Sequence, residues 1–144
     1  MLRPTVLFVD DEAHVTSGLK RAMHRASYRI LTAQSANDAL AIMAQQSVDV
    51  LVADEKMPGI SGSEMLAIAR RDFPQTMRVI LTGHATIEAA KRAVNEGQLH
   101  RFLTKPCTAA ELSEAIEGVL RQKDLTADAN IVIRALEADA QAPW

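Results

Sequence analysis

VLFVDDE, residues 6–12, joins four apolar residues directly to three carboxylates. The run Val6–Val9 does not alternate between apolar and polar residues, which predicts a strand covered on both faces. The carboxylates that follow, Asp10, Asp11 and Glu12, would repel one another by about 4 kcal/mol for each pair at 4 Å and an effective dielectric constant near 20. Such repulsion at a strand end is relieved by a hard cation, so the stretch predicts both a buried strand and a cation site beside it.

The rest of the chain repeats a short apolar run followed by a helix-like segment. This alternation predicts a parallel sheet with right-handed crossovers and helices on both faces, a doubly wound (βα)5 fold. We expect a single domain over residues 1–122 and a helical tail or linker over 123–144, which is too short for a second domain. The expected strands are Val6–Val9, Tyr28–Ala33, Val48–Ala53, Met77–Leu81 and Leu99–Leu103, and the expected helices are 13–26, Asn37–Gln46, Ser63–Arg71, 87–95 with Gly97 at its end, and Thr108–Gln122 with a capping box of Thr108 and Glu111.

Composition excludes several classes of protein. The 144 residues are 48% hydrophobic and 24% charged, as in an ordinary globular domain. A net charge of −2 offers no basic surface for nucleic acid, and no apolar run approaches the roughly 20 residues of a membrane helix. The N-terminus does not resemble a signal peptide, and a lone cysteine, Cys107, excludes a disulfide framework, so we expect a cytoplasmic protein.

Distinctive polar residues follow four of the expected strands. Asp10 and Asp11 follow the first strand, Asp54 the third, Thr82 the fourth and Lys105 the fifth. Because ligands bind at the carboxyl ends of parallel strands, we expect these groups to share one cleft. Carboxylates joined to phosphate are typical ligands of Mg²⁺, or of Mn²⁺ in its place. With a lysine and a hydroxyl beside them, they predict a phosphoryl-transfer site.

The residues also suggest a division of roles. Asp54 stands alone at its strand end and is the expected nucleophile, because carboxylates can form aspartyl phosphates. Asp10 and Asp11 are then the metal pair. Lys105 supplies a positive charge to the phosphoryl oxygens, and Thr82 supplies a hydroxyl donor.

Four segments together resemble the receiver domain of two-component response regulators, which belongs to the CheY-like superfamily. They are VLFVDDE, VDVLVADEKMPGISG, VILTGHA and FLTKP, in the family's order, and the resemblance covers roughly residues 4–122. It implies a flavodoxin-like sheet with strand order 2-1-3-4-5. It also implies that a sensor histidine kinase or a histidine phosphotransfer protein donates a phosphoryl group to Asp54. Such a protein is not an enzyme beyond catalysing its own phosphorylation and dephosphorylation.

The resemblance implies roles for further residues. The backbone carbonyl of Lys56 would complete the metal ligands, and the Lys105–Pro106 peptide bond would be cis. Phe102 would be a switch aromatic that turns inward when Thr82 moves toward the phosphoryl group.

Two side chains near the expected acceptor allow two interpretations. Lys56 lies two residues after Asp54, and His84 lies two residues after Thr82. In the family, side chains at these positions border the phosphoryl group and tune its lifetime. The alternative is that both are solvated side chains without such a role.

Other functions fit the sequence less well. A phosphohydrolase with an Asp nucleophile expects a D-x-D motif after the first strand and a cap domain, whereas this chain has DDE and no cap. A degenerate receiver used as a scaffold would lack some of the key residues, and all are present.

The output is a separate question. We expect a downstream protein to bind the face formed by the fourth helix, fifth strand and fifth helix, with no role for nucleic acid or membrane in this chain; a homodimer is left open. The segments ADEKMPGISG and RFLTKPC resemble receivers joined to cyclic-di-GMP phosphodiesterases of the HD type. The alternative is therefore the N-terminal receiver of a longer regulator with that output.

Overall fold

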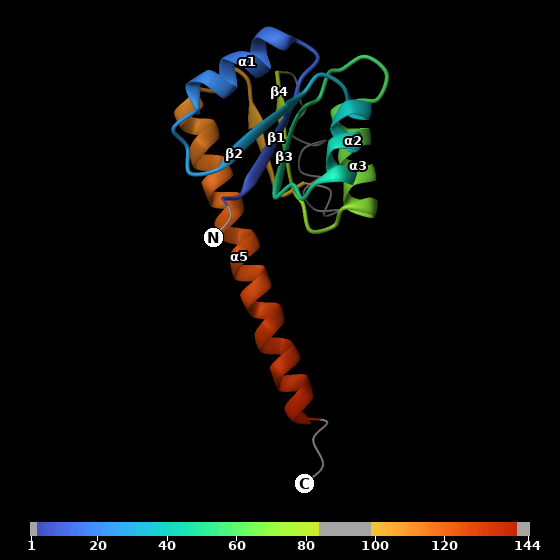
Figure 1. The fold of residues 1–144 in the computed structure, drawn as a ribbon, viewed down its shortest axis with the longest axis vertical. Helices are drawn as coiled ribbons and strands as arrows, with labels where there is room; N and C mark the ends of the chain where they lie inside the picture. The colour runs from blue at the N-terminus through green and yellow to red at the C-terminus, as the bar shows by residue number, and fades with distance from the viewer. Residues whose placement is uncertain (1–2, 84–98, 141–144) are drawn as a thin grey trace.

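A computed structural model describes residues 3–83 and 99–140 and contains one five-stranded parallel sheet (Figure 1). The strand order is β2-β1-β3-β4-β5, which confirms the predicted flavodoxin-like arrangement. Each predicted strand is present, although β3 and β5 begin two residues later than expected. The strands are β1 (Thr5–Val9), β2 (Arg29–Ala33), β3 (Val50–Asp54), β4 (Met77–Thr82) and β5 (Arg101–Thr104).

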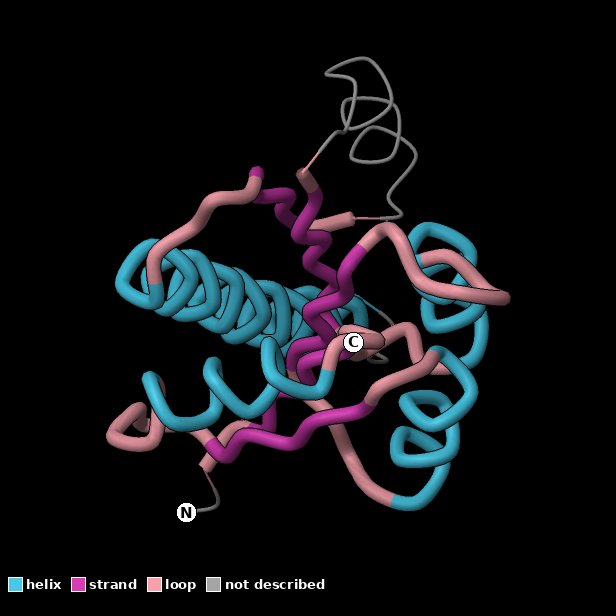
Figure 2. The backbone as a smooth tube through the Cα atoms, turned by 90° about the horizontal axis from the view of Figure 1, so that it is seen from above, coloured by secondary structure: helices cyan, strands magenta, loops and turns pink. Residues whose placement is uncertain are grey.

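Helices cover both faces of this sheet, as Figure 2 shows. The described helices are α1 (Ala13–Ala22), α2 (Ala36–Gln45), α3 (Gly62–Asp72) and α5 (Ala109–Ala140). α1 ends four residues before the predicted limit. The helix expected over 87–95, and Gly97 at its end, lie outside the described residues.

Side-chain caps fix where three of these helices begin. The Ser35 and Ser61 hydroxyls accept hydrogen bonds from the backbone N–H groups of Asp38 and Glu64, at 3.1 and 3.2 Å. At the start of α5, the Thr108 hydroxyl accepts from the N–H of Glu111 at 3.1 Å, and the Glu111 carboxylate accepts from the N–H of Thr108 at 3.4 Å. This reciprocal pair is the predicted capping box.

Two apolar cores lie on opposite faces of the sheet. Strand residues alternate between the faces, so Leu7 and Leu51 point toward α2 and α3, whereas Phe8 and Val52 point toward α1 and α5. All of these side chains are buried. Because both faces are covered, the strands are continuous apolar runs, as Val6–Val9 is in β1.

α5 extends well beyond the helix predicted over Thr108–Gln122 and takes in most of the expected tail. Its capping box lies where expected, but the helix continues unbroken past Gln122 to Ala140. The tail was expected to be helical or a linker, and it is a helix as far as residue 140. Since the helix crosses residue 122 without a break, the division into 1–122 and 123–144 stays a prediction.

Candidate functional site

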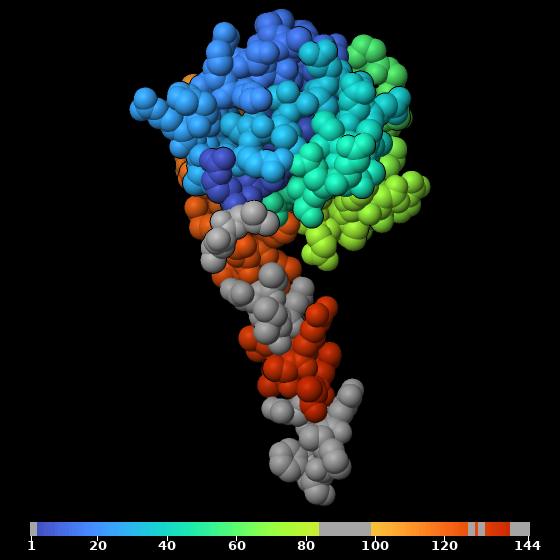
Figure 3. Space-filling model, in the orientation of Figure 1, coloured from blue at the N-terminus to red at the C-terminus, as the bar shows by residue number. Residues whose placement is uncertain are grey.

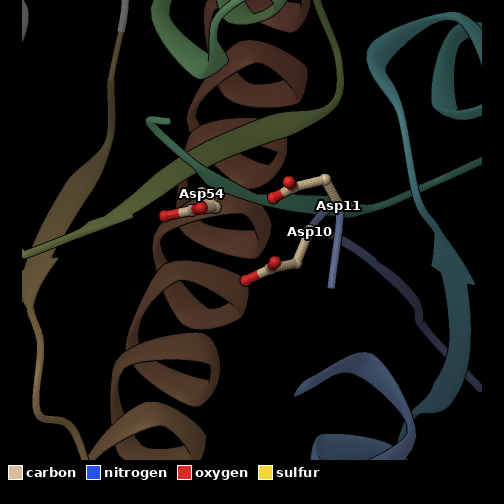
Figure 4. A group of neighbouring side chains, drawn as sticks. All are labelled: Asp10, Asp11 and Asp54. Carbon is tan, nitrogen blue, oxygen red and sulfur yellow. The ribbon is translucent and has the colours of Figure 1, made fainter. Parts of the chain in front are cut away.

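Three carboxylates meet at the carboxyl edge of the sheet (Figure 4). β1 and β3 are neighbours, with Val9 opposite Ala53, so the residues that follow them are brought together. One carboxylate oxygen from each of Asp10, Asp11 and Asp54 lies within 4.8 Å of the others. The sequence predicted that these side chains lie close together, and the register of β1 with β3 brings them together.

Asp10 is the most deeply buried of the three. Its side chain accepts a hydrogen bond from the backbone N–H of Glu12 at 2.9 Å. Burial raises the pKa of Asp10 above its usual range; the Glu12 N–H and Lys105 oppose this rise, and the negative charges of Asp54 and Asp11 add to it. The ionised form of Asp10 is therefore costly in the absence of a cation.

Lys105 brings a positive charge to this cluster. Its Nζ lies 3.1 Å from Oδ1 of Asp54 and 3.7 Å from Oδ2 of Asp10. Burial alone would lower the pKa of Lys105, but the hydrogen bond and charge of Asp54, with a smaller contribution from Asp10, raise it. Lys105 is thus held in its charged form, facing the expected nucleophile.

Pairing of β5 with β4 holds the backbone of Lys105 beside the end of β4. Thr82 and Thr104 are register partners on β4 and β5, and the N–H of Lys105 donates to the carbonyl of Thr82 at 2.8 Å. The Lys105–Pro106 peptide bond is cis. Thr82 is buried at the end of β4, on the same sheet edge as the three carboxylates.

The other predicted site residues lie in different surroundings. Phe102, on β5, is partly buried and packs against the core on the α2 and α3 side. Lys56 is exposed in the loop after β3, and its ammonium group makes no ion pair with any side chain that the structure describes. His84 lies outside the described residues. The switching role of Phe102 and the lifetime roles of Lys56 and His84 stay predictions.

Two residues that support Asp54 were not singled out from the sequence. A Cβ on Gly62 would overlap the backbone carbonyl oxygen of Asp54, so only glycine lets α3 begin so close to the end of β3. The Glu55 carboxylate accepts hydrogen bonds from both the backbone N–H and the hydroxyl of Ser63, in the first turn of α3. The sequence offered one signal, a glycine at the expected start of a helix, but the close approach depends on how α3 packs.

The donor set at this edge fits a divalent cation. Three carboxylates converge, two of them from consecutive residues, and oxygen donors of this kind suit Mg²⁺, which binds through one or two carboxylates and keeps several waters. Lys105 alone cannot neutralise three negative charges. The cluster therefore has the oxygen donors that a divalent cation needs, with one lysine ammonium beside them.

The family model for the response regulator receiver domain matches residues 6–117. The chain belongs to this receiver family. Its match includes both β1, which leads into Asp10 and Asp11, and β5, which leads into Lys105. The acidic cluster thus occurs within a domain of two-component signalling proteins.

Individual relatives agree with this assignment. The hydrogenase transcriptional regulatory protein HoxA of Cupriavidus necator is 32% identical over 124 residues, which are 86% of this chain and 26% of HoxA. The chain thus spans about a quarter of the length of that relative. Since HoxA is named as a transcriptional regulator, the likeness does not favour the alternative of a cyclic-di-GMP phosphodiesterase output.

Solved structures share the fold of this receiver. A crystal structure described as adenylate cyclase from Rhodopirellula baltica is 33% identical, covers 92% of this chain and 98% of that one, and has a TM-score of 0.85. A response regulator receiver domain from Clostridium thermocellum is 34% identical, covers 85% of this chain and 98% of that one, and has a TM-score of 0.78. Within the described residues, no helix is sufficiently long and apolar to span a membrane.

Proposed function

We propose that this receiver accepts a phosphoryl group on Asp54 from a sensor histidine kinase or a histidine phosphotransfer protein. The observation that carries the proposal is the position of Lys105, whose Nζ lies 3.1 Å from Oδ1 of Asp54 within a cluster of three carboxylates. A lysine that pairs with a carboxylate in an already acidic pocket is suited to hold the oxygens of a phosphoryl group there.

The proposed transfer exchanges one bond to phosphorus for another. An oxygen of Asp54 attacks the phosphorus of a phosphohistidine, an O–P bond forms, and the N–P bond of the donor breaks. The departing imidazole nitrogen keeps the electron pair of that bond and is free to take a proton from water. Lys105 and the Thr82 hydroxyl bind the phosphoryl oxygens as the charge shifts between donor and acceptor.

Asp10, Asp11 and Asp54, with the backbone carbonyl of Lys56, would hold Mg²⁺ in this site. When bound, Mg²⁺ supplies charge neutralisation between the acidic cluster and the incoming phosphoryl oxygens. Support comes from the raised pKa of Asp10, because burial beside two other carboxylates makes its ionised form costly until a cation is present.

The proposed output is a change of a protein-binding face. Thr82 and Phe102 lie on adjacent strands at the edge of the sheet formed by β4 and β5. Movement of Thr82 toward the phosphoryl group would let Phe102 turn inward and alter the face that includes β5 and α5. This requires different contacts in the two states, which the phosphoryl group supplies through Thr82 and Lys105.

Intact-mass spectrometry tests the acceptor directly. With acetyl phosphate and Mg²⁺, the parent protein should gain the mass of one phosphoryl group, and Asp54→Asn should gain none. Asp72→Asn is the matched control, because Asp72 is exposed on α3 and pairs with Arg71 rather than with the cluster. Undiminished labelling of Asp54→Asn, or equal loss in Asp72→Asn, would contradict the assignment.

A further inference from the structure

α5 leaves the body of the receiver as a free-standing helix (Figures 1 and 3). It has 32 residues, which at 1.5 Å per residue span about 48 Å. Its first part packs against the sheet through Leu112, Ile116 and Val119, which are buried. At the exit from the body, Lys123 Nζ pairs with Oδ1 of Asp49 at 2.8 Å. Every side chain described beyond Lys123 is exposed.

This projecting part carries large apolar side chains. Leu125, Val132, Ile133 and Leu136 are 69%, 58%, 50% and 63% exposed, and they are the exposed large hydrophobic residues of the described chain. Single exposed leucines are ordinary, but four on one projecting helix mark an interaction surface. With Ala129 they include the series 125, 129, 132, 136, whose spacing of four, three and four residues is a heptad pattern.

This α5 stripe (Leu125, Ala129, Val132 and Leu136) points away from the body of the receiver. With 3.6 residues per turn, it lies roughly 140° around the helix from the line through Leu112, Ile116 and Val119. Among the residues that the structure describes, none of the receiver body covers the stripe, since its four side chains are exposed. A second helix can lie along the stripe without displacing any contact between α5 and the sheet.

We propose that the α5 stripe pairs with the same stripe of a second copy of this chain, as a parallel, in-register, two-stranded coiled coil. This inference does not depend on the proposed phosphorylation. A heptad stripe is self-complementary, because each apolar side chain inserts between those of a matching helix. Two identical helices related by a two-fold axis meet this requirement with one surface.

The residues that flank the α5 stripe also fit a second copy. In a parallel pair, Arg121 lies at a position that faces Thr126 of the other helix, so no like charges meet there. Ile133 flanks the stripe and widens its apolar surface. Gln122 lies one step before Leu125 on the same heptad pattern. Its side-chain amide both donates and accepts, so the Gln122 amides of two copies in register can hydrogen-bond to each other.

A membrane surface is a less suitable occupant. Helices that lie in the membrane interface carry many basic residues on their polar face. From Asp124 to Ala140 the sequence has one basic residue, Arg134, against four acidic residues. Anionic lipid would therefore repel the part of α5 that carries the stripe.

Sedimentation equilibrium over a range of concentrations tests this pairing with the 144-residue chain. The parent should pass from monomer to dimer, and Leu136→Glu should raise the dimer dissociation constant by about a hundredfold or more, because it replaces one leucine on each side of the seam. Leu136 is exposed and glutamate is a good helix former, so the receiver itself should fold normally. Ala138→Glu adds the same charge on the opposite side of α5 and should leave the constant unchanged.

Disulfide trapping tests the parallel register. In a Cys107→Ser background, Gln122→Cys should oxidise to a covalent dimer, because in-register pairing brings the two Cα atoms to disulfide distance. Asp124→Cys, on the outer side of the helix, should not. An antiparallel pair would place residue 122 near residue 139 and give no bond.

Three results would overturn the proposal. The first is a monomeric mass at every concentration, which would leave the stripe to a different partner. The second is an equal effect of Leu136→Glu and Ala138→Glu, which would place any dimer contact elsewhere. The third is cross-linking of Gln122→Cys no greater than that of Asp124→Cys.

Discussion

His100 should make the stability of this receiver depend on pH between 7 and 5. The residue lies just before β5 and bridges to β4 through the backbone of Arg78. The ring Nδ1 of His100 accepts a hydrogen bond from the backbone N–H of Arg78 at 2.9 Å. The backbone N–H of His100 donates to the carbonyl of Arg78 at 2.7 Å. Because Nδ1 is an acceptor, the ring is neutral with its proton on Nε2.

Protonation would remove this bridge. A proton on Nδ1 of His100 would face the backbone N–H of Arg78. The ring would also gain a positive charge close to the buried guanidinium of Arg78. Burial, and then the charge of Arg78, lower the pKa of His100 to about 4. In the unfolded chain a histidine has a pKa of about 6.5.

The magnitude follows from these two values. The folded-state pKa is the lower one, so below pH 6.5 the unfolded chain binds a proton that the folded protein does not. The stabilising effect of neutral His100 is complete above the unfolded pKa and falls as the pH drops toward 4. The loss between pH 7 and pH 5 should be about 2 kcal/mol in the free energy of unfolding.

His100→Asn isolates this effect, because the Asn side chain keeps an acceptor oxygen in place of Nδ1 and does not titrate. Urea denaturation at pH 7 and pH 5 should show a loss for the parent that exceeds the loss for His100→Asn by about 2 kcal/mol. His24→Asn is the control, since His24 is exposed and its ring bonds only locally, to the carbonyl of Arg21. Equal losses in the parent and His100→Asn, or NMR titration of the His100 ring near 6.5, would refute the reasoning.

Two further predictions concern the acidic cluster. Mg²⁺ at ten times its Kd should stabilise the parent by about 1.4 kcal/mol and raise its Tm by a few degrees. Asp11→Ala should lose most of this rise in Tm, and the control Asp72→Ala should keep it. An unchanged rise in Asp11→Ala would exclude Asp11 as a ligand. Lys56→Ala should lose its phosphoryl group faster than the parent after the donor is removed, because the exposed ammonium of Lys56 can shield the phosphoryl group from attacking water. Decay followed by mass spectrometry at matched Mg²⁺ tests this, with Lys20→Ala on α1 as control; equal or slower decay in Lys56→Ala would make Lys56 a solvated loop residue.

The pattern of the sequence predicted the sheet and the edge where the site lies. Strands buried on both faces must be apolar throughout, as Val6–Val9 is. Such a run can be recognised in the sequence without knowing which strands lie beside it. The polar residues that end such strands must lie at one edge when the strands are parallel. For this reason Asp10, Asp11, Asp54 and Lys105 could be grouped from their positions alone, and the strand register then brought them together.

Details that depend on packing were not readable in the same way. The close approach of Gly62 to Asp54 requires the position of α3, which no local pattern specifies. The lowered pKa of His100 requires its burial beside Arg78, a residue 22 positions earlier. The sequence pattern did not single out this histidine, because its partner is set by the pairing of β5 with β4.

In α5, some features follow from the sequence and others only from the tertiary structure. Its capping box and apolar spacing determined from sequence that a helix begins after Thr108, and apolar residues such as Val132 and Leu136 indicated that the tail could be helical. Only the tertiary structure decided that the helix continues without a break to Ala140 and that these side chains lie clear of the body. Helical spacing is a local property of the chain, whereas the covering of a helix face depends on where every other element lies.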